Sequence, residues 1–221
     1  MKEIYITPTN DYFSQLNNKF KPFIACQVTS TVMALTINGV SFEYPQNMQP
    51  EDYLFELCGT PQATEQVKIL TPWFWDNATN QPKYPPREIH AVLAWTTNNL
   101  LVKREVMFPY LPPHGANLKE ILFSVLKKNS VVTATVLVPD GHIVVTSGFI
   151  TNQDNIEQVQ SADQIDLSQV THIIIDDPYG NYLSGYKNPN GSHTVLDINT
   201  WNEKVVTQQD TTDKLVHFIH N

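Results

Sequence analysis

Three residue types that together can perform thiol hydrolysis lie at defined places in this sequence: a cysteine, a histidine and an aspartate. After Cys26, the residues Val28, Val32 and Leu35 recur at helical spacing, and Asn38-Gly39 supplies a stop signal. Cys26 is therefore predicted in the first turn of a helix. The unpaired N–H groups and the positive dipole end of a helix N-terminus favour the thiolate, which is the nucleophilic form of cysteine. Cys26 is the candidate nucleophile.

A thiol nucleophile needs a base, and His142 is the candidate. Residues 131–138 and 142–150 are both rich in branched side chains, and the chain-reversal signal Pro139-Asp140-Gly141 between them predicts an antiparallel hairpin. A further strand is predicted at 172–176, before a turn that begins at Asp177. If it pairs antiparallel with the strand starting at His142, the start of one lies beside the end of the other. His142 and Asp177 then become neighbours.

A carboxylate beside His142 would fix the imidazole tautomer and stabilise the imidazolium. Asp176 competes with Asp177 for this role, and successive strand residues point to opposite faces, so only one of them should reach His142. The pattern alone does not choose. The other histidines do not combine a strand end with a nearby carboxylate and are expected to be polar surface or core residues: His90, His114, His172, His193, His217 and His220.

The helices and strands predicted around these residues indicate an α+β fold. Asn117 and Glu120 have the spacing of a capping box and start a helix with one apolar face that ends near Lys128-Asn129. A short helix is predicted at 87–98, and the rest of 45–113 is expected to be loop. With no repeat or low-complexity segment, residues 1–221 are predicted to form one domain.

Composition limits the function. The 221 residues carry a formal net charge of -8, which argues against a nucleic-acid partner, since phosphate binding needs clustered Lys and Arg. The sequence shows no signal peptide and no apolar stretch long enough to span a membrane, which predicts a soluble protein. It shows no zinc spacing, phosphate loop or calcium loop, so no cofactor is expected. Cys58 is expected to be a small buried hydrophobe.

Three segments carry a family resemblance. The first is YFSQLNNKFKPFIACQVTSTVMALTINGV, and the others are GHIVVTSGF and IIIDDPYGNYLSGY. They resemble the nucleophile region, the Gly-His-hydrophobic strand and the strand followed by Asp-Pro-x-Gly of papain-fold peptidases related to the bacteriocin-processing, double-glycine-leader peptidases. The positions that match in the first segment are Gln15, Asn17, Pro22, Cys26, Thr29, Ser30 and Met33.

This resemblance implies site residues and a fold. By the likeness, Asp177 is the triad acid, and the side-chain amide of Gln15 forms an oxyanion hole with the backbone N–H of Cys26. The implied fold is papain-like, with an N-terminal nucleophile helix packed on an antiparallel sheet. The resemblance covers the first forty residues and about 117–186, so residues from about 45 to 113 form an atypical aromatic-rich insertion. Gln27 departs from the pattern, since many relatives have a small residue or asparagine there.

The function implied is that of a cysteine peptidase or amidohydrolase of bacterial or phage origin. Its substrate would be a polypeptide or the peptide part of a bacterial cell wall, and its location cytoplasmic, or released or virion-associated if phage-encoded. An acyl transferase would use the same thioester with an amine in place of water. The alternative from another class is a non-catalytic papain-fold module for binding or virion assembly. Four aromatic residues that could line a cleft are expected in the core: Tyr12, Trp73, Trp75 and Trp95.

Overall fold

A computed structural model describes residues 1–6, 12–110, 115–138, 141–207 and 213–221. The α-helices are α1 (Cys26–Ile37), α2 (Pro50–Cys58), α3 (Pro61–Leu70), α4 (His90–Thr96), α5 (Leu118–Leu126) and α6 (Ile198–Lys204). The strands are β1 (Lys2–Tyr5), β2 (Trp75–Asp76), β3 (Gln81–Pro82), β4 (Met107–Tyr110), β5 (Val131–Thr135), β6 (His142–Thr151), β7 (Val170–Asp176), β8 (Thr194–Asp197) and β9 (Val216–Ile219).

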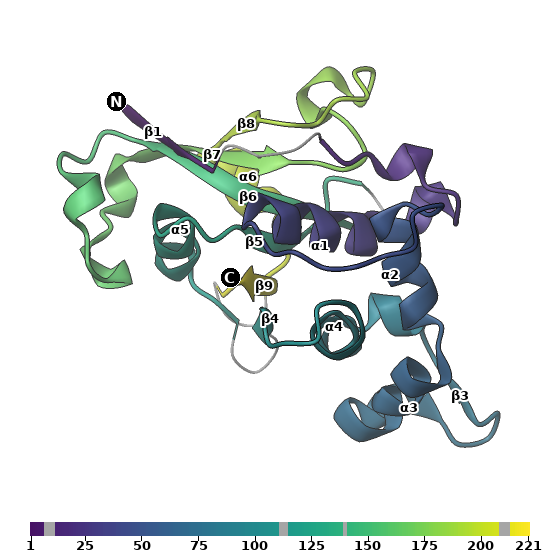
Figure 1. The fold of residues 1–221 in the computed structure, drawn as a ribbon. Coiled ribbons are helices and arrows are strands. Elements are labelled where there is room, and N and C mark those ends of the chain that lie inside the picture. The colour runs from purple at the N-terminus through teal and green to yellow at the C-terminus, as the bar shows by residue number, and fades with distance from the viewer. Residues whose placement is uncertain (7–11, 111–114, 139–140, 208–212) are drawn as a thin grey trace.

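Within these residues the structure is a mixed α and β fold built on a seven-stranded antiparallel sheet (Figure 1). The strand order is β4-β9-β5-β6-β7-β8, and β1 pairs with β6. The predicted α+β class and the antiparallel β5–β6 hairpin are confirmed. The proposed turn residues Pro139 and Asp140 lie outside the described part of the chain.

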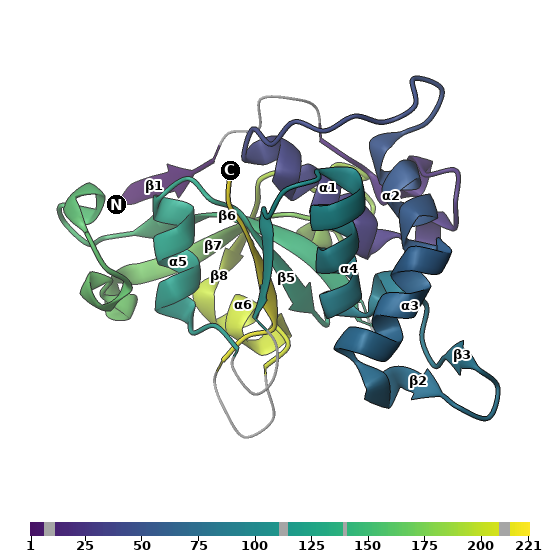
Figure 2. The ribbon, with the colours of Figure 1, turned by 60° about the horizontal axis from the view of Figure 1, so that its bottom comes forward.

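Helix α1 packs on the sheet across β5 and β6. It begins at Cys26, as the spacing predicted, and Asn38 is its C-cap. Nearly all of its side chains are buried, so its hydroxyl residues form hydrogen bonds inside the protein. Ser30, for example, donates from its hydroxyl to the Ile143 carbonyl at 2.9 Å. Figure 2 shows α1 and α5 on the same side of the sheet.

Helix α5 has the capping box that the sequence predicted. The Asn117 side chain accepts the backbone N–H of Glu120, and the Glu120 carboxylate accepts the backbone N–H of Asn117. The reciprocal bonds satisfy two helix-end donors. The buried positions Ile121, Leu122 and Val125 face β5 and β6, so this helix is amphipathic.

The region 45–113 contains more structure than was predicted. The predicted helix at 87–98 is present as α4, but the expectation of loop elsewhere is wrong: α2, α3 and the β2–β3 hairpin lie there, and β4 joins the main sheet. Pro50 and Pro61 both stand at the first helical position, which is a usual helix-start signal. Helix α2 buries Glu51 and Asp52 as well as apolar residues, and α3 buries only the small side chains of Ala63 and Val67, so the buried positions do not stand out as a run of large apolar residues. Both pack on neighbouring helices.

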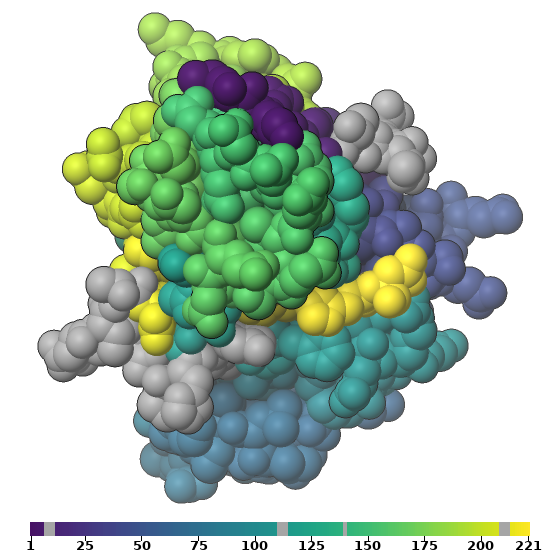
Figure 3. Space-filling view, turned by 90° about the vertical axis from the view of Figure 1, so that its left-hand side faces the viewer, coloured from purple at the N-terminus to yellow at the C-terminus, as the bar shows by residue number. Residues whose placement is uncertain are grey.

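Strands β5 and β1 also differ from the sequence analysis. The strand predicted at 131–138 ends at Thr135, and Val136 is exposed. Strand β1, which was not predicted, is only four residues long, too short for its alternation to stand out. Its first residue, Lys2, forms an ion pair with Glu157, and Figure 3 shows β1 in purple against the green segment that contains Glu157. No helix in the described segments is both long and apolar enough to cross a membrane.

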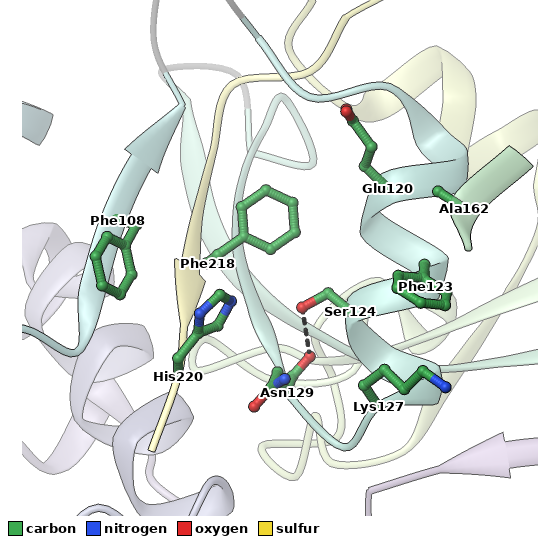
Figure 4. Close-up of a pocket in the computed structure, with 9 residues that line it drawn as sticks. All are labelled: Phe108, Glu120, Phe123, Ser124, Lys127, Asn129, Ala162, Phe218 and His220. Carbon is green, nitrogen blue, oxygen red and sulfur yellow. Dashed lines mark hydrogen bonds between the residues drawn. The ribbon is translucent and has the colours of Figure 1, made fainter. Parts of the chain in front are cut away.

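A hollow of about 420 Å³ lies between α5 and the β4–β9 pair. Phenylalanine side chains from all three elements line it, with Glu120 and Lys127 on the helix side (Figure 4): they are Phe108, Phe123 and Phe218. None of the four predicted catalytic residues is among its lining residues. The hollow is therefore separate from the candidate chemistry.

Asn38 joins the end of α1 to the sheet. Its side-chain amide donates to the Ile219 carbonyl at 2.6 Å and accepts from the N–H and hydroxyl of Ser130. We expect Asn38→Ala to lower the free energy of unfolding by roughly 2 to 4 kcal/mol, because buried groups of two strands lose their partners. Urea unfolding measures this. Asn99→Ala, at an exposed position, is the control, and an equal effect of both substitutions would contradict the assignment.

Candidate active site

Cys26 lies at the first residue of α1, directly after the 3-10 turn η2 (Pro22–Ile24). Its side chain is a free thiol with 7% exposure. The Thr29 hydroxyl donates to the Ala25 carbonyl and accepts from the Asn18 amide, which fixes the entry into the helix. A thiolate here would lie at the positive end of the helix dipole. The predicted placement of Cys26 is confirmed.

The loop before Cys26 is held at two points. The Asp52 carboxylate accepts the backbone N–H of Lys19 at 3.0 Å and that of Phe20 at 3.1 Å. The backbone N–H of Gln15 donates to the Pro178 carbonyl at 2.9 Å. The loop is thus bonded both to α2 and to the turn that follows β7, which brings three distant segments of sequence together.

His142 is the first residue of β6 and is 4% exposed. Its ring nitrogen Nε2 lies 2.6 Å from Oδ1 of Asp177. The Cys26 side chain also interacts with the ring and acts to raise the imidazole pKa. With Nε2 engaged by Asp177, Nδ1 is the nitrogen left for the thiol. The structure therefore brings together Cys26, His142 and Asp177 in the order that proton transfer requires; their catalytic roles remain predictions.

The sheet register explains why His142 meets Asp177. Strands β6 and β7 are antiparallel, and their last pair at this end is Val145 with Asp176. Asp177 is the residue directly after β7, and His142 lies three residues before Val145 in β6. The two side chains therefore meet just beyond the last pair of the ladder. The neighbouring position that antiparallel pairing predicted is confirmed.

The strand pattern left open which of the two aspartates reaches His142, the family resemblance pointed to Asp177, and the hydrogen bonds show that it is Asp177. Asp176 points away from His142: its Oδ1 accepts from the hydroxyls of Tyr5 and Ser192 and from the His193 N–H. Asp177 accepts from His142 instead. Because successive side chains of a strand point to opposite faces, Asp176 and Asp177 reach different partners.

The Asp177 carboxylate is fully buried and makes two further bonds. The Tyr179 N–H donates to Oδ1 at 2.9 Å, and the Tyr186 hydroxyl donates to Oδ2 at 3.2 Å. The backbone is fixed as well, because the Asp177 N–H donates to Gly191 O and the Tyr12 hydroxyl donates to Asp177 O. A Cβ at Gly191 would lie 2.2 Å from Asp177 O, so this position requires glycine.

The environment of His142 raises its pKa. Burial by itself lowers the pKa of an imidazole, but here the hydrogen bonds and negative charges of Asp177 and Cys26 act the other way and raise the pKa to about 9. Such a shift favours the imidazolium form of His142 at neutral pH. A thiol hydrolase uses a histidine in this form beside its nucleophile.

Gln15 lies next to the nucleophile turn and is 1% exposed. Its Nε2 donates to the Pro22 carbonyl at 2.8 Å, while its Oε1 is buried without a hydrogen-bond partner. One N–H of the amide is thus held by the turn that leads into Cys26, and the second N–H remains for another acceptor. The role of Gln15 in an oxyanion hole remains a prediction.

The remaining cysteine and histidines are engaged elsewhere. Burial raises the pKa of Cys58 to about 12, although Thr96 and Arg87 act in the opposite direction. His90 and His217 hydrogen-bond each other, and burial lowers the pKa of both rings. The partners of the other described histidines are Thr171 for His172, Glu3 for His193 and the Phe108 ring for His220. His114 lies outside the described residues.

The aromatic residues only partly follow the expectation of a core role. Trp73 is 63% exposed, which contradicts that expectation, and Trp75 and Trp95 are half-buried. Tyr12 contacts Asp177 O, as described above. Sequence reasoning missed the roles of Tyr12, Tyr179, Tyr186 and Gly191, and the tyrosine-rich run after Asp177 was the one available signal.

Comparison with protein-family models, with curated proteins and with solved structures found no match for this chain. Among the residues that the structure describes, no group of three or more His, Cys, Asp or Glu side chains is arranged to hold a metal ion. The site is therefore interpreted from its own geometry.

The raised pKa of His142 has a measurable consequence. The folded pKa of about 9 lies above the ordinary 6.5, so the ion pair stabilises the fold fully below about pH 6.5 and this contribution is lost as pH rises through about 9. NMR titration of His142 should give an apparent pKa near 9. Asp177→Asn and Cys26→Ala should each lower it. A wild-type value at or below 6.5 would refute the ion pair.

Proposed function

We propose that this chain is a papain-like cysteine hydrolase that cleaves amide bonds with Cys26, His142 and Asp177. The observation that supports this is a single imidazole that is hydrogen-bonded to a buried carboxylate and has its pKa raised both by that carboxylate and by a cysteine side chain at a helix start. A buried histidine with a raised pKa between such partners is typical of a functional site. The packing of α1 on the antiparallel sheet agrees with the proposed papain-like fold.

The proposed reaction begins as His142 holds the proton of Cys26. The thiolate attacks the carbonyl carbon of the substrate amide and forms a tetrahedral oxyanion. The Cys26 N–H, at the unpaired start of α1, and the Gln15 amide donate to this oxygen. The C–N bond breaks as His142 gives its proton to the leaving amine, and a thioester remains. Water then attacks the thioester, its proton passes to His142, and the thiol is restored as the carboxylic acid leaves.

The proposed substrate is a polypeptide or the peptide part of a bacterial cell wall. The turn before Cys26 exposes Phe23 and Ile24, at 74% and 42%, and Leu16 is 40% exposed. Apolar side chains at this edge favour an uncharged peptide segment over a charged polymer. The setting proposed with this activity is bacterial or phage-encoded, either cytoplasmic or released with a virion.

Thiol labelling tests the nucleophile without knowledge of the substrate. At about pH 6, iodoacetamide should modify Cys26 at least about a hundredfold faster than Cys58, because only a paired thiolate is reactive there. The pKa of about 12 for Cys58 makes that thiol an internal control. Mass spectrometry of the two cysteine-containing peptides measures both rates. His142→Ala should remove the difference, and equal slow labelling in the wild type would contradict the proposal.

A second experiment tests turnover. The protein and its Cys26→Ala variant are incubated with a peptide library and with purified cell-wall sacculi, and new amine ends are quantified. The wild type should cleave one class of substrate, and the variant should lose at least about a thousandfold in rate, since a triad acts as a unit. Cleavage that survives in the variant would exclude Cys26 as nucleophile. Incorporation of an added amine would identify acyl transfer instead.

A non-catalytic binding or virion assembly module is the second candidate function. The observation in its favour is the exposure of aromatic rings around the β2–β3 hairpin, where Trp73 is 63% and Tyr84 is 52% exposed. Exposed aromatic side chains of this kind are enriched in binding surfaces. Slow labelling of both cysteines at about pH 6 would favour this candidate over the hydrolase.

A further inference from the structure

The second oxygen of the Asp177 carboxylate has a donor of its own. Oδ1 faces His142 and the Tyr179 N–H, whereas Oδ2 accepts from the Tyr186 hydroxyl at 3.2 Å. A carboxylate held on both oxygens cannot rotate about its last bond without losing a hydrogen bond. The bond to Tyr186 therefore restricts the direction in which Oδ1 points.

The backbone that presents Tyr186 is unusual. Gly185 and Tyr186 both have left-handed conformations, with φ of +62° and +61°. A bulky residue with this conformation is uncommon and is often found where structure serves function. The Tyr186 N–H donates to Asn181 O at 3.0 Å and so holds the strained residue in place. This turn returns the chain toward Asp177, nine residues after it.

The ring of Tyr186 is also fixed, by two other tyrosines. Tyr179 and Tyr182 make edge contacts with it at centroid distances of 5.1 and 6.1 Å. Tyr179 in turn makes an edge contact with His142 at 6.1 Å. Burial and the charge of Asp177 raise the pKa of Tyr186 well above its usual value, so the hydroxyl keeps its proton. The Tyr186 hydroxyl is therefore a neutral hydrogen-bond donor, and it does not compete with the His142 imidazolium for the negative charge of Asp177 as a cation would.

We propose that Tyr186 is a positioning residue of the site, which holds the Asp177 carboxylate in the orientation that lets Oδ1 bond His142. The inference rests on the proposed function, since it assigns Tyr186 to the same thiol, imidazole and carboxylate. Tyr186 does not contact the reacting atoms. It acts through Asp177, and its loss should weaken the imidazolium and thereby the thiolate.

The test uses the full chain and alkylation of Cys26, so that no substrate is needed. Tyr186→Phe should slow modification by iodoacetamide at about pH 6 by about threefold to tenfold, the size expected for the net contribution of one ordinary intramolecular hydrogen bond. It should also lower the apparent pKa of His142, measured by NMR. Tyr182→Phe, which keeps the ring contact and removes a hydroxyl from the same segment, should change neither quantity.

A merely structural role predicts a different result. In that case Tyr186→Phe would lower the thermal midpoint but leave the His142 pKa and the labelling rate unchanged, and this would overturn the inference. The double variant with Asp177→Asn should label no more slowly than Asp177→Asn alone, because both substitutions break one chain of contacts. If the double variant instead labels more slowly than Asp177→Asn alone, by the factor that Tyr186→Phe causes in the wild type, the inference would also be overturned. If Cys26 of the wild-type protein is not labelled fast, the result would instead refute the proposed function.

Discussion

The short hydrogen bond between His142 and Asp177 is the interaction on which the site depends. It lies in the interior, where a carboxylate is costly to bury unless its charge is matched by hydrogen bonds and an opposite charge. Bonds from a backbone N–H and a tyrosine hydroxyl add to this compensation. The charged carboxylate is stable in the interior because the surrounding residues supply these hydrogen-bond donors and the imidazole. A mispaired sheet would leave it buried without a partner.

The geometry of the site is therefore produced by contacts that are distant in sequence. The nucleophile comes from a helix near the start of the chain, the histidine from the first residue of β6 and the carboxylate from the end of β7. The Ser30 hydroxyl bonds the Ile143 carbonyl and so fixes α1 directly to the residue after His142. The loop before Cys26 is bonded to Pro178, directly after Asp177. The residues next to His142 and Asp177 are thus both bonded to the segment that carries Cys26.

Much of this arrangement could be predicted from local patterns. The start of α1, the capping box of α5 and the antiparallel strands each have strong short-range signals, and pairing then placed His142 near Asp177. The strand pattern by itself could not choose between Asp176 and Asp177, because side-chain direction depends on where the ladder ends; only the family resemblance pointed to Asp177. Helices α2 and α3 were missed because the positions they bury are partly acidic in α2 and small in α3, so burial does not follow a run of large apolar residues. Tyr186 was missed because its contact depends on a left-handed turn, which no sequence period encodes.

Strand β9 lies between β4 and β5 in the sheet, although residues 216–219 come more than eighty positions after β5. During synthesis, the ladder that joins β4 to the rest of the sheet is incomplete until this late segment has left the ribosome. Until then β5 exposes an unpaired edge, which can pair with other chains. Completion of the sheet therefore waits for more than eighty residues to be made after β5, and in that interval the nascent chain most needs protection from aggregation.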